Sequence, residues 1–203
     1  MAEDAVEVER RLLAEGAMNH VEASYARVAE QNGVADVSRN TKVECLMMGY
    51  TEEDLKFGEG TNLGLGCGNP VALAKLQPGE VVVDLGSGPG FDCFLAGERV
   101  GPTGSVIGVD RELEMVKRAR DFSKSRGAPH VSFRLGEIAY LPVADQFADV
   151  LISNGVLCLT LSPRQVYSDA FRILRPGGRF VFADMVLKKA LPSELLTAQA
   201  FAS

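Results

Sequence analysis

A glycine-rich segment followed by a carboxylate is the part of this sequence best suited to hold a ligand. Residues 84–90 read Asp-Leu-Gly-Ser-Gly-Pro-Gly, directly after the apolar run VVVDL and directly before a helical pattern. A junction of this kind aims backbone N–H groups and the helix dipole at a bound group. Asp110 ends the next apolar run, at a spacing where a carboxylate can accept both hydroxyl protons of a ribose. Loop and acid together predict an adenosine-containing ligand.

The spacing of the glycines excludes two common phosphate-binding loops. A dinucleotide fingerprint, GxGxxG, would need its third glycine at position 91, which is Phe91. A Walker loop would need GK[ST], which does not follow these glycines. The ligand is therefore predicted to carry adenosine without a pyrophosphate.

Two further segments are candidates for the same cleft. Gly136-Glu137-Ile138 follows the third apolar run, and Ser153-Asn154-Gly155 ends the fourth. In open α/β sheets, ligands bind outside the carboxyl ends of the strands. Both segments are therefore predicted to reach the ligand.

The cysteines are a second set of residues that could do chemistry. There are four of them, Cys45, Cys67, Cys93 and Cys158. They form neither the CxxC pairs of a zinc site nor the dense framework of a secreted disulfide protein. The pattern predicts reduced thiols in a cytoplasmic protein and no metal site. His20 and His130 belong to no recognisable motif and are expected at the surface.

Alternating apolar runs and helical patterns predict the elements that position these residues. The expected strands are 81–85, 105–110, 131–135, 148–153 and 179–186. The expected helices are 91–100, 112–126 and 163–174, with a short connection at 138–141 and a stop at Pro176-Gly177-Gly178. This alternation is typical of right-handed crossovers in a mainly parallel sheet, so the predicted fold class is α/β.

The residues before the first strand read as a helical cap. An amphipathic pattern covers residues 4–31, a second helical stretch lies near 43–48, and Thr51 can cap a short turn through Phe57. We expect one compact domain, with a cap and glycine-rich lead-in over residues 1–78 and a ligand-binding core over residues 79–203.

Composition limits the class of partner. The chain has 203 residues and carries 21 Lys and Arg against 27 Asp and Glu, a net charge of −6 that disfavours nucleic acid. The acidic N-terminus MAEDAVEVERRLLAEG is neither a signal nor a transit peptide. No apolar run approaches the roughly 18 residues that span a bilayer. A cytoplasmic protein acting on a small molecule, without a membrane segment, is expected.

The motifs VVVDLGSGPG and GVD resemble those of class I S-adenosylmethionine-dependent methyltransferases. The resemblance implies a Rossmann-like sheet ordered 3-2-1-4-5 and S-adenosylmethionine as cofactor. It assigns Asp84 to the cofactor's amino group, Arg111 to the adenine, and Asn154 to the methionine end. The implied lining of the methionine and ribose region is Gly86, Ser87, Gly88 and Gly90, while the segment Gly136, Glu137 and Ile138 closes over adenine.

Over residues 49–186 the sequence is similar to one subfamily, the arsenite methyltransferases. The segments LGLGCGNP, DLGSGPGFDCFLA, RLGEIAYLPVAD and FRILRPGGRFVFAD carry this likeness. In that subfamily several cysteine thiolates hold trivalent arsenic while its lone pair attacks the sulfonium methyl. Cys67 matches one of these ligands.

The chain departs from the subfamily at the other arsenic ligands. The family has a cysteine after Ser-Asn, where this chain has Gly155, and Cys158 lies three residues further on. Cys158 is therefore either a substitute ligand or a buried structural thiol, and Cys93 is expected in the core. A third family cysteine is expected nearer Asn40 than Cys45, and a fourth would lie beyond Ser203.

Three functions remain open at this point. The first is methyl transfer to a small acceptor, with trivalent arsenic as the named candidate. The second is methylation of a quinone or another small molecule at carbon, and the third is a non-catalytic relative that binds S-adenosylmethionine as a partner or regulator. Strands 6 and 7 of the class are absent here, so strand 5 is predicted to be an uncovered edge. A homodimer or a missing C-terminal region would cover it.

Overall fold

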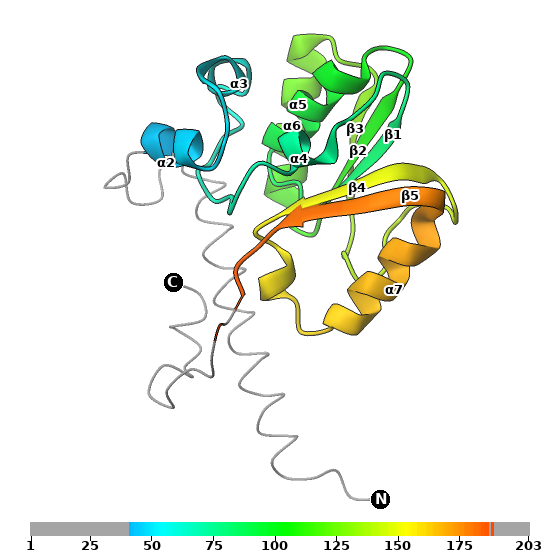
Figure 1. Ribbon diagram of the computed structural model, residues 1–203. Helices are drawn as coiled ribbons and strands as arrows, with labels where there is room; N and C mark the ends of the chain where they lie inside the picture. Colours follow the sequence, from blue (N-terminus) through cyan, green and yellow to red (C-terminus); the bar gives the residue numbers. More distant parts are fainter. Residues whose placement is uncertain (1–40, 187, 189–203) are drawn as a thin grey trace, which may run out of the picture.

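A parallel five-stranded sheet forms the centre of the computed structural model, which describes residues 41–186 and residue 188 (Figure 1). Its strands are β1 (Val81–Leu85), β2 (Ser105–Asp110), β3 (Val131–Leu135), β4 (Ala148–Asn154) and β5 (Leu174–Ala183). Their order is β3-β2-β1-β4-β5, and each neighbouring pair is parallel. The predicted fold class and strand order are confirmed. The carboxyl ends of all five strands meet at one edge, where the glycine loop begins.

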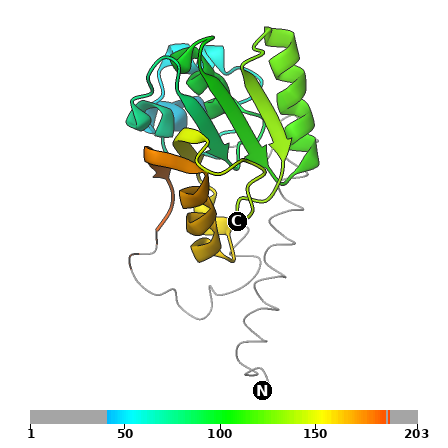
Figure 2. The same ribbon diagram turned by 90° about the vertical axis from the view of Figure 1, so that its right-hand side faces the viewer.

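Helices cover both faces of this sheet (Figures 1 and 2). One face packs against α4 (Pro70–Ala74), α5 (Phe91–Val100) and α6 (Leu113–Arg126). The opposite face packs against α7 (Pro163–Ile173). Consecutive side chains of β1 point to opposite faces of the sheet: Val82 packs in the core on the first face, and Val83 packs in the core on the second. Both are fully buried, as expected for a central parallel strand.

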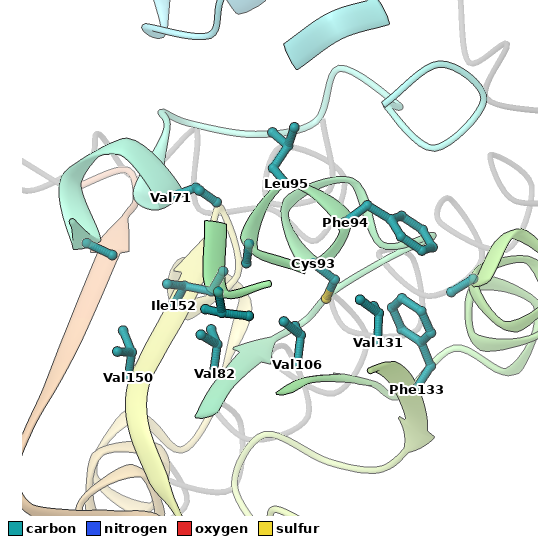
Figure 3. Packing of buried hydrophobic residues seen from close by; sticks show 14 of the residues in the cluster. Val71, Val82, Cys93, Phe94, Leu95, Val106, Val131, Phe133, Val150 and Ile152 are labelled. Carbon is teal, nitrogen blue, oxygen red and sulfur yellow. The ribbon is translucent and has the colours of Figure 1, made fainter. Parts of the chain in front are cut away.

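The core beneath α5 contains Cys93 (Figure 3). Its side chain is fully buried among apolar neighbours that include Val106 and Phe94. The rings of Phe94 and Phe133 meet at 5.6 Å in a tilted arrangement. The prediction that Cys93 lies in the core is confirmed.

Short helices precede the sheet. They are α2 (Thr41–Met47) and α3 (Glu52–Phe57), which come before α4 in the chain. A 3₁₀ turn, η1 (Leu157–Leu159), follows β4. Thr51 caps α3 as predicted: the Asp54 N–H donates to Thr51 Oγ1 at 3.0 Å, and the Thr51 N–H donates to the Asp54 carboxylate at 2.9 Å. The helix predicted over residues 4–31, with His20, lies outside the described residues.

The structure corrects the predicted start of the fifth strand. β5 begins at Leu174, immediately after α7 ends at Ile173, and not at Arg179. Ala148 pairs with Leu174 and Val150 pairs with Arg179, so the intervening Pro-Gly-Gly forms an irregularity inside the ladder. Proline lacks a donor, and Gly177 has a φ of +82°, so these residues interrupt the pairing without ending the strand.

Two smaller expectations can also be compared with the structure. The short connection predicted at residues 138–141 is a turn, in which the Tyr140 N–H donates to the Glu137 carbonyl at 3.1 Å. His130 is half-buried, with Nε2 at 3.3 Å from the Gly97 carbonyl oxygen, and is thus less exposed than predicted.

Candidate functional site

The loop from β1 to α5 turns through three left-handed glycines. Gly86, Gly88 and Gly90 have φ values of +73°, +52° and +96°. The N–H groups of Gly86 and Ser87 donate to the Val109 carbonyl at 2.8 and 3.0 Å, which ties the loop to β2. Gly90 is also the N-cap of α5, and no side chain caps the helix there. The loop is thus fixed in a conformation that glycine adopts readily.

The three glycines have different surroundings. A Cβ on Gly86 would lie 2.5 Å from Val156, and a Cβ on Gly90 would lie 2.5 Å from Phe133. A Cβ on Gly88 would meet nothing within 4 Å. Gly86 and Gly90 therefore allow close packing, whereas Gly88 faces the open space of a cavity.

This cavity measures about 480 Å³ and lies at the carboxyl edge of the sheet. It brings together most of the residues predicted to bind the cofactor: Asp84, Gly86, Ser87, Gly88, Asp110, Arg111, Glu137, Ile138 and Asn154. Gly90 and Gly136 do not line it. A Cβ on Gly136 would lie 2.8 Å from Pro142, so this glycine allows packing of the chain behind the cavity.

Asp110 is held at the end of β2 by two backbone amides. Its Oδ2 accepts from the Gly88 N–H at 2.8 Å, and its Oδ1 accepts from the Glu112 N–H at 2.8 Å. Burial is the largest effect on this group and raises the pKa of Asp110, while the two amides oppose it. Each carboxylate oxygen keeps a further lone pair, so Asp110 can still accept hydrogen bonds from two hydroxyl groups of a ligand.

Ser87 has a buried hydroxyl without a partner. Its Oγ has no hydrogen-bond partner among the described residues. Leaving a buried polar group unpaired costs about 1–3 kcal/mol. Ser87 lines the cavity, but its Oγ is turned toward β2, where a Cβ on Gly108 would lie 2.6 Å from it.

Two buried acids stand at the inner wall of the cavity. Asp92 accepts from Tyr50 Oη at 2.7 Å and from Asn154 Nδ2 at 3.0 Å, and Asp84 accepts from Cys93 Sγ at 3.2 Å. Burial, above all, raises the pKa of Asp92 to about 6. Burial and the neighbouring Asp92 raise the pKa of Asp84 well above its usual range. Such a wall favours a cationic group on the ligand.

The opposite wall combines an ion pair with an apolar residue. Arg111 Nε lies 3.4 Å from Glu137 Oε1, and both side chains are roughly half exposed. Ile138 lies beside them. A guanidinium and an aliphatic side chain can both lie against a flat aromatic base.

The two candidate arsenic ligands converge next to this cavity but do not line it. The Cys158 N–H donates to Asp184 Oδ2 at 3.3 Å, and the Cys67 sulfur has the backbone of Met185, the residue after Asp184, as a hydrogen-bond partner. Burial, followed by the charge of Asp184, raises the pKa of Cys67. Burial and Asp184 raise the pKa of Cys158 to about 12, and the nearby Cys67 adds to this. All four cysteines are free thiols.

Gly155 lies against the Cys67 thiol. A Cβ built at Gly155, where φ is +69°, would lie 3.2 Å from Cys67 Sγ. Position 155, where the arsenite methyltransferases have a cysteine, is thus in direct contact with Cys67, the cysteine that matches their other arsenic-binding position.

Other cavity residues were missed by sequence reasoning. The cap contributes Cys45, Met48 and Tyr50, and the first turn of α5 contributes Asp92. Tyr50 and Met48 have no local pattern that indicates a ligand site. Asp92 did carry a signal, because it is an acid in the first turn of the helix that follows the glycine loop.

Two kinds of site are not found in the described part of the chain. No group of three or more His, Cys, Asp or Glu side chains is arranged there to hold a metal ion. Within residues 41–186 and 188, every helix is too short or too polar to span a bilayer.

Comparisons with known proteins agree with this geometry. The family described as "Methyltransferase domain" matches residues 76–202. The arsenite methyltransferase of Halobacterium salinarum is 50% identical over 149 residues, which cover 73% of this chain and 38% of that protein. The arsenite methyltransferase of Aquipseudomonas alcaligenes is 39% identical over 137 residues, which cover 64% of this chain and 39% of that protein.

A solved structure is similar over the same region. The arsenic(III) S-adenosylmethionine methyltransferase from Chlamydomonas reinhardtii superposes with a TM-score of 0.59 at 31% identity, covering 76% of this chain and 52% of that one. The chain therefore spans about half of this structure and about two-fifths of the two curated relatives.

Proposed function

Because the chain belongs to the methyltransferase-domain family, we propose that it binds S-adenosylmethionine in the cavity and transfers its methyl group to a small acceptor. The single observation that carries the proposal is the open space over Gly88, bordered by the Asp110 carboxylate. The relatives and the similar solved structure, which are named for this cofactor or for methyl transfer, support it.

The residues of the cavity fit the parts of this cofactor. Asp110 would accept the ribose hydroxyls, the loop with Ser87 and Gly88 would lie along the ribose and methionine region, and Asp84 with Asp92 would attract the cationic ammonium and sulfonium groups. Arg111 and Ile138 would lie against adenine. When bound, the cofactor supplies a methyl group on a sulfonium. The protein itself would hold the acceptor in line with the methyl–sulfur bond and exclude water.

We propose trivalent arsenic as the acceptor, held by the thiols of Cys67 and Cys158. Two observations support this: the relatives are named arsenite methyltransferases, and both cysteines converge on Asp184 and Met185. Each protein thiol would replace one thiol ligand on arsenic. One As–S bond forms as another breaks, and the protein thiol's proton passes to the departing thiolate. The raised pKa values of both cysteines mean that each thiol is protonated before arsenic arrives and loses its proton as its As–S bond forms.

A second candidate is methyl transfer to an apolar small molecule. The cavity wall beyond Asn154 is formed by Leu65, Leu159 and Leu161, whereas neither Cys67 nor Cys158 reaches it. A catalytically inactive relative would share the same cofactor cavity. Titration calorimetry with S-adenosylmethionine, followed by methylation assays with arsenite and glutathione and with a quinone, separates these functions. Binding without turnover of any acceptor would select the non-catalytic reading.

Replacing the ribose acid should weaken cofactor binding. Asp110→Ala removes two charge-assisted hydrogen bonds and also the contact with the Gly88 N–H, so we expect a loss of roughly 2–4 kcal/mol in binding free energy. Titration calorimetry measures it. Asp121→Ala, which removes an exposed acid of α6, provides the control for the change of net charge. Unchanged affinity in Asp110→Ala would refute the assignment.

Cofactor affinity should rise as the pH increases from about 5 to about 7, because the raised pKa values of Asp92 and Asp84 keep these acids protonated at the lower pH. Ionised acids attract the cationic cofactor and neutral acids do not, so the sign of the effect is fixed. Adenosine carries neither cationic group and serves as the reference ligand. If the ratio of the two affinities stays constant over this range, the acids do not face the cationic end.

We also propose that a second copy of the chain or a C-terminal region covers the free edge of β5. Within the described residues, β5 pairs only with β4, and its Phe182 is 43% exposed beside Tyr167. Sedimentation velocity should show a dimer if a second copy is the cover. A monomer at micromolar concentration would indicate instead that a C-terminal region covers this edge. A cytoplasmic location stays a prediction.

A further inference from the structure

Asn154 connects three parts of the chain through one carboxamide. Its Oδ1 accepts from the N–H groups of Cys67 at 2.7 Å and Gly68 at 3.2 Å. Its Nδ2 lies within hydrogen-bond distance of the Gly68 carbonyl at 2.8 Å, Tyr50 Oη at 3.0 Å and Asp92 Oδ2 at 3.0 Å. This orientation of the amide is the only one consistent with its partners, because the reverse would set an oxygen against a carboxylate and a carbonyl.

The loop that carries Cys67 is fitted closely onto this amide. A Cβ on Gly66 would lie 2.7 Å from Asn154 Nδ2, so only a residue without a side chain lets the loop approach. The loop cannot move relative to β4 without breaking the bonds of Cys67 and Gly68 to Asn154.

The other partners of Asn154 belong to the cavity wall. Tyr50 and Asp92 both line the cavity and bond to each other at 2.7 Å, and the ring of Tyr50 packs against Phe91 at 5.0 Å. Asn154 itself also lines the cavity, whereas the Cys67 thiol lies outside its lining and against Gly155. Asn154 therefore stands between the cofactor cavity and the thiol.

We propose that Asn154 is a positioning residue that couples occupation of the cavity to the position of the Cys67 thiol. The inference rests on the proposed cofactor binding. An occupant that contacts Asp92 or Tyr50 changes the hydrogen bonds available to Asn154 Nδ2, and the same amide fixes the backbone of Cys67. Coupling of this kind is reciprocal, so a group bound to the thiol also alters cofactor affinity.

The test measures the alkylation rate of Cys67 by iodoacetamide, followed by mass spectrometry of its peptide, with and without S-adenosylhomocysteine. In the unaltered protein, saturating ligand should change this rate by roughly threefold or more, because the alkylation rate follows the exposure and the thiolate fraction of the sulfur. Asn154→Ala should raise the rate in the ligand-free protein and abolish the response to ligand. Calorimetry on the same samples confirms that the ligand binds.

The matched control is Asn69→Ala. Asn69 is a buried amide near Cys67, but it bonds to the Gly49 carbonyl and the Ala72 N–H rather than to the cavity wall. This variant should keep the response to ligand. Tyr50→Phe, which retains the ring but deletes one link on the cavity side, should reduce the response and serves as the second variant if Asn154→Ala does not fold.

Each result separates the two proposals. If the ligand binds but the Cys67 rate does not change in the unaltered protein, or if Asn154→Ala keeps the full response, the coupling is overturned and the proposed function stands. If calorimetry detects no binding of ligand to the unaltered protein, the proposed function is overturned, and the coupling with it.

Discussion

Gly88→Val should abolish cofactor binding while the protein remains folded. A Cβ on Gly88 projects into open space within the cavity, so the two methyl groups of valine would occupy the volume that the cofactor needs. The φ of +52° adds a strain of about 1–2 kcal/mol for a residue with a side chain. We expect affinity for S-adenosylmethionine to fall at least about a hundredfold, which is roughly 2.7 kcal/mol, by titration calorimetry.

Gly127→Val separates the loss of space from the backbone strain. Gly127 ends α6 with a φ of +61° and also has nothing within 4 Å of its Cβ position, but it does not line the cavity. Both variants should lose similar thermal stability, and only Gly88→Val should lose binding. Equal loss of binding in both would mean that strain in the fold, and not occupation of the cavity, is responsible.

The first three strands, β1, β2 and β3, were predictable because their signals are local. β1, β2 and β3 begin and end where their apolar runs do, since each is bounded by a turn or loop. The start of β5 was not predictable in this way. Pro176-Gly177-Gly178 is typical of a stop between elements, and only pairing with β4 shows that the ladder continues across it.

The candidate site likewise contains residues that local sequence predicts and residues that only long-range contacts bring together. The glycine loop and Asp110 were predicted because strand, loop and acid follow one another in the chain, and the strand order brings them to one edge. Tyr50 and its bond to Asp92 join residues far apart in sequence, and no pattern in either segment encodes that contact. The place of Cys67 outside the cavity lining was not predictable either, because its loop is held by hydrogen bonds to the distant Asn154.

Introducing a third thiol should convert weak arsenic binding into tight binding. In the natural chain we expect at most two protein sulfurs per arsenic, from Cys67 and Cys158, so Cys67→Ser should remove most binding and Cys93→Ser should leave it intact. A cysteine at Gly155 would place its Cβ about 3.2 Å from Cys67 Sγ, in contact with the retained ligand. Gly155→Cys should therefore raise the affinity for trivalent arsenic at least about tenfold, or 1.4 kcal/mol, measured without competing small thiols.

Gly155→Ser is the matched control, because it imposes the same side chain at a φ of +69° without a soft donor atom. X-ray absorption should count one more As–S bond in Gly155→Cys than in Gly155→Ser, three against two if Cys158 is also a ligand. Cys158→Ser in each background then decides the role of the remaining thiol. Loss of one As–S bond would make Cys158 a ligand, and no loss would make it structural. Equal affinities of the Cys and Ser variants at position 155 would show that arsenic does not bind beside Cys67, which would move the acceptor to another chemical class and leave the cofactor cavity unaffected.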